Sequence, residues 1–205
     1  MKPDGRLRTI DGMANERGTP DEARLWLLSR DGDPQAFGAI FDLHRDRVFS
    51  HALRLLGSWA DAEDVAAAAF LELFRRRSDV RVVRGSVLPW LLVTTANLAR
   101  NSSRAKRRHR DFLARLPRAS EAASVEDRRS IDLDPRLLRA LRELPEADLA
   151  LLALVALEDF AIADAAAALG ITPAAAKTRL HRARDRVRRN LPDFLVVVDQ
   201  MGDSR

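Results

Sequence analysis

Residues 161–190 read AIADAAAALGITPAAAKTRLHRARDRVRRN, and no other stretch says as much about the architecture. An alanine-rich helical segment runs to Leu169, a tight turn follows at Gly170-Ile171, and Thr172-Pro173 supplies a cap and a first-turn proline for the next helix. Helix, tight glycine turn and capped helix form the helix-turn-helix pattern. Because alanine-rich helical hairpins also occur in many bundles, the pattern on its own is moderately specific.

The second of these two helices is strongly basic. Its positively charged residues are Lys177, Arg179, Arg182, Arg184, Arg186, Arg188 and Arg189, and Asp185 is its only acid. Like charges three or four residues apart on a helix repel each other by about 0.2–0.5 kcal/mol per pair. DNA phosphates would neutralise this charge while the N-terminal half of the helix reaches base edges in the major groove. The alternative is a basic face that is merely solvated.

The chain on both sides of this hairpin is also predicted to be helical. Helices are expected over residues 136–143 and from Pro145 onward, so a second module runs over residues 135–191. Residues 116–134 are rich in serine and acids, lack a hydrophobic period and form a flexible linker. An earlier module spans residues 19–115, after a flexible extension over residues 1–18, and residues 192–205 form a tail. The predicted fold is all-α, with two helical modules joined by the linker.

The earlier module has the pattern of a four-helix bundle. The four helices are expected to begin at Thr19-Pro20, Asp33-Pro34, Ser58 and Ser86. The predicted packing stripe of the second helix is Phe37, Phe41, Val48, Ala52 and Leu55. That of the third helix is Ala62, Val65, Ala66, Phe70, Leu73 and Phe74.

The fourth helix of this module ends in a second basic run, over residues 100–110. A basic helix end beside a small polar pocket could hold a DNA backbone while Asn97 hydrogen-bonds the edge of an unstacked base. The alternative makes Asn97 an ordinary surface residue. Trp90, on the same helix, needs no such role, because core packing explains a tryptophan there.

The amino-acid composition is compatible with nucleic-acid binding and argues against several other classes of protein. Of the 35 basic residues only Lys2, Lys106 and Lys177 are lysine, and the planar fork of arginine suits phosphate oxygens. A GC-rich genome would enrich arginine equally. The absence of cysteine excludes disulfides and thiol catalysis. No apolar run approaches the roughly 20 residues of a membrane span and no secretion signal begins the chain, so we expect a cytoplasmic protein without membrane insertion.

Nothing in the sequence indicates an enzyme. His44 and His51 lie on the packing stripe of the second helix, where they are predicted to be core residues with satisfied hydrogen bonds, and His109 and His181 lie in basic runs. No carboxylate pair has metal-ligand spacing, and neither a phosphate-binding glycine loop nor a nucleophile motif occurs. We expect no catalytic residue, no metal and no cofactor.

Five stretches of the chain form a recognisable series. They are Asp33-Pro34-Gln35-Ala36-Phe37, His51 to Gly57 (HALRLLG), Asp61-Ala62-Glu63-Asp64-Val65, Trp90-Leu91 with Asn97, and Leu144-Pro145-Glu146 followed by Ala168-Leu169-Gly170-Ile171 and Lys177 to Arg184 (KTRLHRAR). In this order, over residues 20–191, they resemble the extracytoplasmic-function sigma factors of bacterial RNA polymerase, and the last stretch is the most specific match. The resemblance implies that the first module is sigma region 2, which binds core polymerase and the −10 element, and that the second is the region 4 helix-turn-helix, which binds the −35 element.

The same resemblance implies roles for particular residues. Core-polymerase binding, on the clamp of the largest subunit, falls on Asp61, Glu63 and Asp64. Binding of the −10 element falls on Asn97, which would line the pocket for a flipped base, and on Arg100, Asn101, Arg104, Lys106 and Arg107. Binding of the −35 element falls on Lys177, Thr178, His181 and Arg182, with Arg179 and Arg184 beside them. The linker acids Glu121, Glu126, Asp127 and Asp132 permit a path toward the polymerase cleft, and an anti-sigma factor is an expected partner.

The chain departs from the family at two places. Ala67, Ala68 and Ala69 replace the usual polar residues after the acidic cluster, which puts the strength of the clamp contact in doubt. Ala161 replaces a serine cap, and Ala165 replaces a buried isoleucine, so the second module is expected to be of marginal stability alone.

Two other functions fit the residues. One is a stand-alone helix-turn-helix regulator, in which residues 20–115 mediate dimerisation or ligand binding; it would bind duplex operator DNA without polymerase. The other is a protein that occupies polymerase without licensing transcription, for which the alanines of the third helix are the only support.

Overall fold

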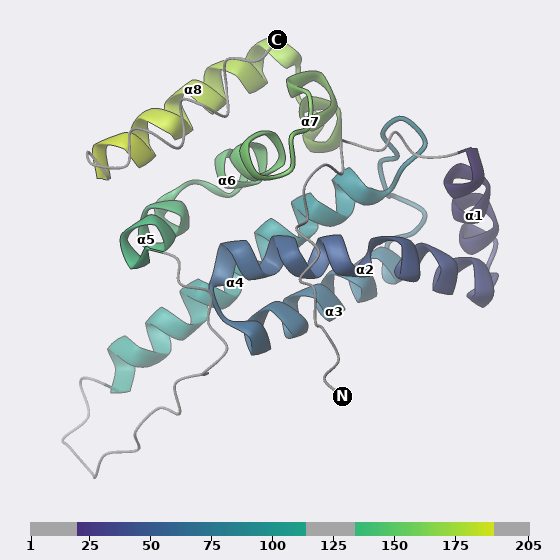
Figure 1. The fold of residues 1–205 in the computed structure, drawn as a ribbon, viewed down its shortest axis with the longest axis horizontal. Helices are drawn as coiled ribbons and strands as arrows, with labels where there is room; N and C mark the ends of the chain where they lie inside the picture. The colour runs from purple at the N-terminus through teal and green to yellow at the C-terminus, as the bar shows by residue number, and fades with distance from the viewer. Residues whose placement is uncertain (1–19, 114–133, 191–205) are drawn as a thin grey trace, which may run out of the picture.

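The computed structural model describes residues 20–113 and 134–190, which are helical apart from turns, loops and one isolated β-bridge between Val83 and Ser86. The first module contains α1 (Pro20–Arg30), α2 (Pro34–Leu56), α3 (Trp59–Arg75) and α4 (Leu88–Leu113). The second contains α5 (Pro135–Glu143), α6 (Glu146–Leu152), the π-helix η1 (Ala153–Leu157), α7 (Ile162–Leu169) and α8 (Pro173–Asn190), as Figure 1 shows. Thr19, the extension, nearly all of the predicted linker and the tail lie outside the described residues.

The helices of the first module begin and end where local chemistry places them. The Asp33 carboxylate accepts the backbone N–H of Gln35 at 2.8 Å, which caps α2, and Gly57 ends that helix at a positive φ of 73°. The Ser58 hydroxyl then accepts the Asp61 N–H at the start of α3. The expected fourth helix begins two residues later than predicted, because Ser86 takes part in the bridge and its hydroxyl accepts the Leu88 N–H.

The predicted packing stripes are confirmed except at two phenylalanines. Val48, Ala52 and Leu55 on α2 are buried, and so are the predicted α3 residues Ala62, Val65, Ala66, Phe70 and Leu73. Phe41 on α2 and Phe74 on α3 are instead 38% and 47% exposed, and Ile40, which was not predicted, is buried. The exposed rings are not isolated, since Phe41 packs edge-on against Phe70 with centroids 4.7 Å apart.

The helix-turn-helix prediction is confirmed. Gly170 ends α7 in the left-handed region at φ 67°, and the Ile171 N–H reaches back to the Ala166 carbonyl. The Thr172 hydroxyl accepts the Ala175 N–H at 3.2 Å and so caps α8. The start of α7 has no such cap, because Ala161 makes no side-chain hydrogen bond there.

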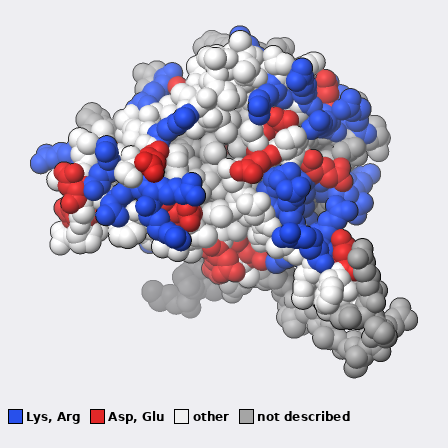
Figure 2. Space-filling model, turned by 180° about the vertical axis from the view of Figure 1, so that it is seen from behind, with Lys and Arg blue, Asp and Glu red and all other residues white. Residues whose placement is uncertain are grey.

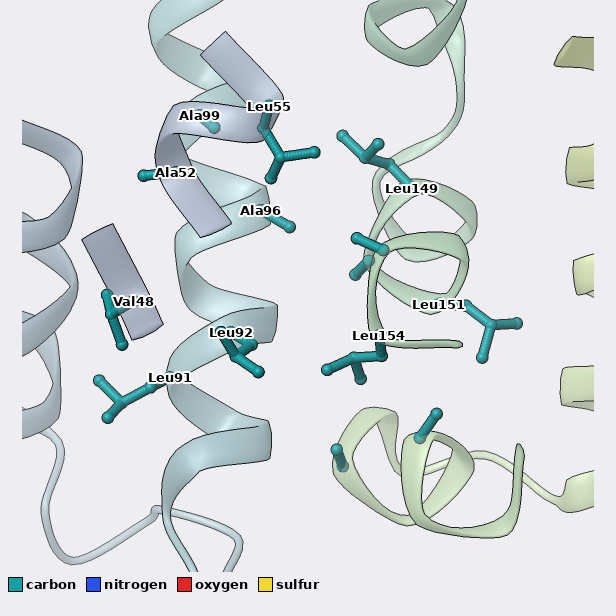
Figure 3. Close-up of a cluster of buried hydrophobic side chains, with 14 of the residues drawn as sticks. Val48, Ala52, Leu55, Leu91, Leu92, Ala96, Ala99, Leu149, Leu151 and Leu154 are labelled. Carbon is teal, nitrogen blue, oxygen red and sulfur yellow. The ribbon is translucent and has the colours of Figure 1, made fainter. Parts of the chain in front are cut away.

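The two modules pack against each other across α4. One cluster of buried hydrophobic side chains runs through both modules, and α4 contacts α5, α6, η1 and α7 of the second module. Figure 3 shows Leu149 and Leu154 pointing from the second module toward α4, on the side where Leu92 and Ala96 lie. Small side chains on α4, including Ala96 and Ala99, are buried there and allow the helices to approach closely.

None of the helices in the described parts of the chain is both long and apolar enough to cross a membrane.

Candidate nucleic-acid interface

The outer face of α8 carries most of the residues predicted to read DNA. Lys177, Thr178, His181 and Arg182 are all exposed, and helical spacing places them on one side of the helix. The Thr178 hydroxyl donates to the Ala174 carbonyl, and the His181 ring lies 3.3 Å from the Asp185 carboxylate. Lys177 and Arg182 have no ion pair with any residue that the structure describes. Their charges are thus available to phosphates or base edges.

The inner side of α8 uses its arginines differently. Arg179 and Arg186 both approach the carboxylate of Asp148 on α6, at 3.6 and 4.0 Å. Arg184 is half-buried, and its Nε has no hydrogen-bond partner among the described residues. Of the six residues predicted for the −35 element, Arg179 and Arg184 therefore face their own module, which periodicity alone did not distinguish.

On α4, four of the predicted residues for the −10 element share one face. Asn97, Arg100, Asn101 and Arg104 follow the three- and four-residue spacing of a helical stripe. The Asn97 side-chain oxygen is buried without a hydrogen-bond partner in the described structure. Arg100 is already engaged, because its Nε donates to the backbone carbonyl of Leu144 in the second module at 2.9 Å.

The other two predicted residues of α4 lie elsewhere on the helix. Lys106 is nine positions beyond Asn97, about two and a half turns, so it projects from the opposite side. Its ammonium donates to both carboxylate oxygens of Asp61 on α3, at 2.6 Å to Oδ2. Arg107 is exposed and lies 3.9 Å from Asp111 one turn later. A residue predicted to bind DNA is thus paired with a residue predicted to bind polymerase.

The acidic cluster predicted to meet polymerase lies in the first turns of α3. Glu63 and Asp64 are exposed, and the Glu63 carboxylate accepts the indole N–H of Trp59 at 2.9 Å. Of the alanines that follow, Ala69 is fully buried, whereas Ala67 is exposed. The departure at Ala69 therefore concerns core packing, and only the more exposed positions bear on a surface contact.

A buried carboxylate between the modules was missed from the sequence. Glu158, which follows η1, is only 5% exposed, and His51 Nδ1 lies 2.8 Å from its Oε1. Arg47 Nε donates to its Oε2 at 2.8 Å, and Arg54 Nη2 donates to Oε1. Burial raises the pKa of Glu158, but the hydrogen bonds and charges of these partners outweigh it and lower that pKa. Burial is also the main reason that the pKa of the His51 ring is lowered.

A second buried carboxylate, Glu22, lies within the first module. His44 Nε2 lies 2.9 Å from Glu22 Oε1, which also accepts the Val87 N–H at 2.9 Å. Burial raises the pKa of Glu22, but the hydrogen bond and charge of His44 together with hydrogen bonds from the Val87 N–H and the Ser86 side chain outweigh burial and lower that pKa. The prediction that His44 and His51 are core residues is confirmed, and each ring bonds to a buried carboxylate. The prediction of satisfied hydrogen bonds is met only in part at His51, because its Nε2 is buried without a partner among the described residues. The sequence signal for these buried acids was the presence of His44 and His51 on the predicted packing stripe, because a buried histidine needs a hydrogen-bond partner.

Basic side chains of α4 and α8 lie on the same side of the molecule. Figure 1 places the C-terminal ends of α4 and α8 on one side, and Figure 2, seen from behind, shows Lys and Arg with acids among them on that side and a second basic group on the opposite side. No group of three or more metal-ligating side chains occurs in residues 20–113 or 134–190. The surface is suited to polyanion binding.

Comparisons with known proteins agree with this arrangement. Residues 40–109 match the family described as sigma-70 region 2, and residues 135–187 match sigma-70, region 4. The chain is 32% identical over 166 residues to the RNA polymerase sigma factor CarQ of Myxococcus xanthus, covering 80% of this chain and 94% of that protein. It is 24% identical over 174 residues to the ECF RNA polymerase sigma factor SigW of Bacillus subtilis (strain 168), covering 80% and 92%.

Among solved structures, the chain is similar to CnrH in complex with the cytosolic domain of CnrY, with a TM-score of 0.55 and 22% identity over 84% of this chain and 97% of that one. At this identity the likeness shows a shared fold. The two matched regions stand in the same order as the two helical modules, and a sigma factor is matched over almost its whole length. The chain therefore belongs to the extracytoplasmic-function sigma factors of the sigma-70 family, non-catalytic subunits that direct RNA polymerase to specific promoters for transcription initiation.

Proposed function

We propose that this sigma factor reads the −35 element through the outer face of α8 and holds melted −10 DNA on α4. The observation that carries the first part is the exposed set on α8, where Lys177 and Arg182 project without ion pairs to the described residues. Arginine and lysine in a major-groove helix donate to guanine edges, and Thr178 and His181 lie beside them for further contacts. Arg179 approaches Asp148 on the inner side of the helix, and Arg184 is half-buried.

The −10 element is assigned to the Asn97 face of α4. A buried amide oxygen without a partner is unfavourable, and the exocyclic amine of a flipped base could satisfy it. Arg100, Asn101 and Arg104 continue from Asn97 toward the basic helix end, where a single-stranded backbone could follow. This path requires Arg100 to leave the Leu144 carbonyl.

Core polymerase is assigned to the N-terminal turns of α3. Asp61, Glu63 and Asp64 present carboxylates there, and an acidic surface suits a basic partner surface on the clamp of the largest subunit. The module boundaries follow the same division, with region 2 over residues 19–115, region 4 over residues 135–191 and residues 116–134 as the tether.

Regulation by an anti-sigma factor and action in the cytoplasm, where polymerase meets promoters, complete the proposal. The solved complex of CnrH with CnrY shows that a protein of this fold binds a second chain. An anti-sigma factor here would compete with polymerase for region 2 or region 4 surfaces.

The test is transcription in vitro from genomic DNA with purified core polymerase and the full chain, followed by mapping of transcript starts. We expect new starts that require the chain and share two upstream elements. Arg182→Ala should relax the consensus of the upstream element and Asn97→Ala should reduce opening of the downstream one, whereas Glu146→Gln, an exposed change on α6, should alter neither. Starts with unchanged consensus and opening in both variants would contradict the residue assignments.

A further inference from the structure

The contact between region 2 and region 4 is centred on a buried charge cluster. The three α2 side chains around Glu158 are Arg47, His51 and Arg54, spaced so that they share one face of the helix. His51 is fully buried and Glu158 is 5% exposed. These hydrogen bonds join residues more than 100 positions apart, so they exist only when the modules are together.

Glu158 bonds to several region 2 side chains at once, so the contact between the modules depends on it more than on a single ion pair. Arg47 bonds its carboxylate and, through Nη2, its backbone carbonyl at 3.2 Å, and lies over the ring of Phe160 at 5.5 Å. A buried carboxylate is tolerated only with such partners, and removing its charge leaves the partly buried guanidinium groups of Arg47 and Arg54 and the buried ring of His51 without their common acceptor. The closed arrangement therefore depends on Glu158 in a way that an exposed ion pair would not.

Further bonds join the two modules. Arg84 Nε donates to the buried Asp164 carboxylate at 2.7 Å, and Arg142 Nη2 donates to the Leu56 carbonyl at 3.3 Å. The apolar contact described above covers one side of α4. The interface thus combines an apolar core with charged hydrogen bonds, as stable protein interfaces do.

The closed arrangement is incompatible with simultaneous reading of both promoter elements. Their names place them about 25 base pairs apart, which at roughly 3.4 Å per base pair is on the order of 80 Å of straight duplex. In this structure the −35 module lies directly on α4, the helix assigned to the −10 element, and holds Arg100 through Leu144. The modules must separate before both can bind DNA.

From these contacts we infer that Glu158 is a latch: in the free sigma factor it clamps region 4 onto region 2 by way of Arg47, His51 and Arg54, and so masks α4 until core polymerase draws the modules apart. The masking rests on the proposed −10 role of α4, whereas the latch itself does not. Its partner is the chain's own region 2, so no second protein is needed to keep the free molecule closed.

The test measures the distance between the modules in the full chain. The chain has no cysteine, so Asp46→Cys on α2 and Ala167→Cys on α7, both exposed positions, provide unique attachment sites for a fluorophore pair. We expect one short distance in the parent protein. Glu158→Gln should raise the ratio of open to closed molecules by at least about tenfold, and the matched change Glu146→Gln should leave it unchanged.

Two further measurements keep the outcomes distinct. Arg47→Gln, from the partly exposed side of the cluster, should open the chain to a smaller extent and serves if Glu158→Gln loses helical content. Binding of a labelled −10 single strand to the free chain should tighten in the opened variants. Opening without tighter binding would support the latch and count against the α4 assignment. A parent protein that is already open, or folded variants that stay closed, would overturn the latch.

Discussion

The two basic helices of this sigma factor differ in what their cations contact in the free chain. On α8, Lys177 and Arg182 project into solvent without ion pairs to the described residues. On α4, Arg100 bonds to the second module and Lys106 bonds to Asp61. The difference shows that charge counted from a sequence is not charge available to DNA. We infer that α8 can meet duplex DNA as it stands, whereas α4 must first exchange its internal bonds.

The largest effect is expected on α8. Arg182→Ala should weaken binding to −35 DNA by about 1–3 kcal/mol and relax selectivity at the base pair that it contacts. Arg179→Ala, the matched change on the inner side, should cost less because Asp148 already holds that arginine. Binding isotherms with base-substituted −35 duplexes measure both, and a larger loss for Arg179→Ala would reverse our assignment of the two faces.

A smaller effect is expected at Asn97 on α4. Asn97→Ala should slow promoter opening by about fivefold, the value of one hydrogen bond near 1 kcal/mol, and leave closed-complex binding nearly unchanged. Fluorescence of 2-aminopurine in the −10 element follows opening, and retardation at low temperature follows closed-complex formation. Asn101→Ala, an exposed neighbour on the same face, provides the comparison. Equal losses at both steps would argue against a base pocket at Asn97.

Because Asp61 pairs with Lys106, a change at Asp61 is expected to weaken binding to core polymerase and to strengthen binding to single-stranded DNA. Asp61→Asn should weaken core binding by less than about 1 kcal/mol, as for a partly exposed pair, and should strengthen binding of single-stranded DNA because Lys106 is released. Asp64→Asn should weaken core binding alone, since Lys106 keeps its partner. Titrations with core polymerase and with an oligonucleotide separate the two, and identical behaviour of both variants would show that the pair has no coupling role.

The smallest effect is expected from pH. The pKa of His51 is lowered in the closed chain, so the unfolded chain binds the proton more readily and stability falls as pH drops below about 6.5. The pKa of Glu158 is lowered too, so its contribution persists above about pH 4.5 and is lost only below that. Denaturant unfolding at pH 7.5 and 5.5 should show a smaller pH dependence in His51→Gln than in the parent protein. An unchanged pH dependence would mean that His51 does not titrate in this range.

The sequence predicted structure that neighbouring residues determine, and it did not predict contacts between residues far apart in the chain. Gly170, Thr172 and Pro173 specify the helix-turn-helix within a few residues, and the structure confirms it. That His51 needs a buried partner also follows from its place on a packing stripe. That the partner is Glu158 does not, because no periodicity connects residues 107 positions apart.

The candidate site was likewise predicted only in part. The basic residues lie on α4 and α8, in segments that the sequence predicted to be helical. Which face of its helix each residue occupies, and what it contacts there, depends on tertiary neighbours such as Asp148 and Asp61. Phe41 and Phe74 show it for the core, since helical periodicity does not tell which residues of an apolar stripe a partner helix covers completely. Which face is buried is decided by the partner helix.

The most direct test compares the free chain with the holoenzyme on two labelled DNAs, a −35 duplex and a −10 single strand, in the same salt. If the free chain is open in a tenth of molecules or fewer, its apparent affinity for the single strand is reduced by about tenfold or more. We therefore expect core polymerase to tighten binding of the −10 strand by at least that factor more than binding of the −35 duplex. Equal tightening of both would contradict the claim that α8 is available in the free chain and α4 is not.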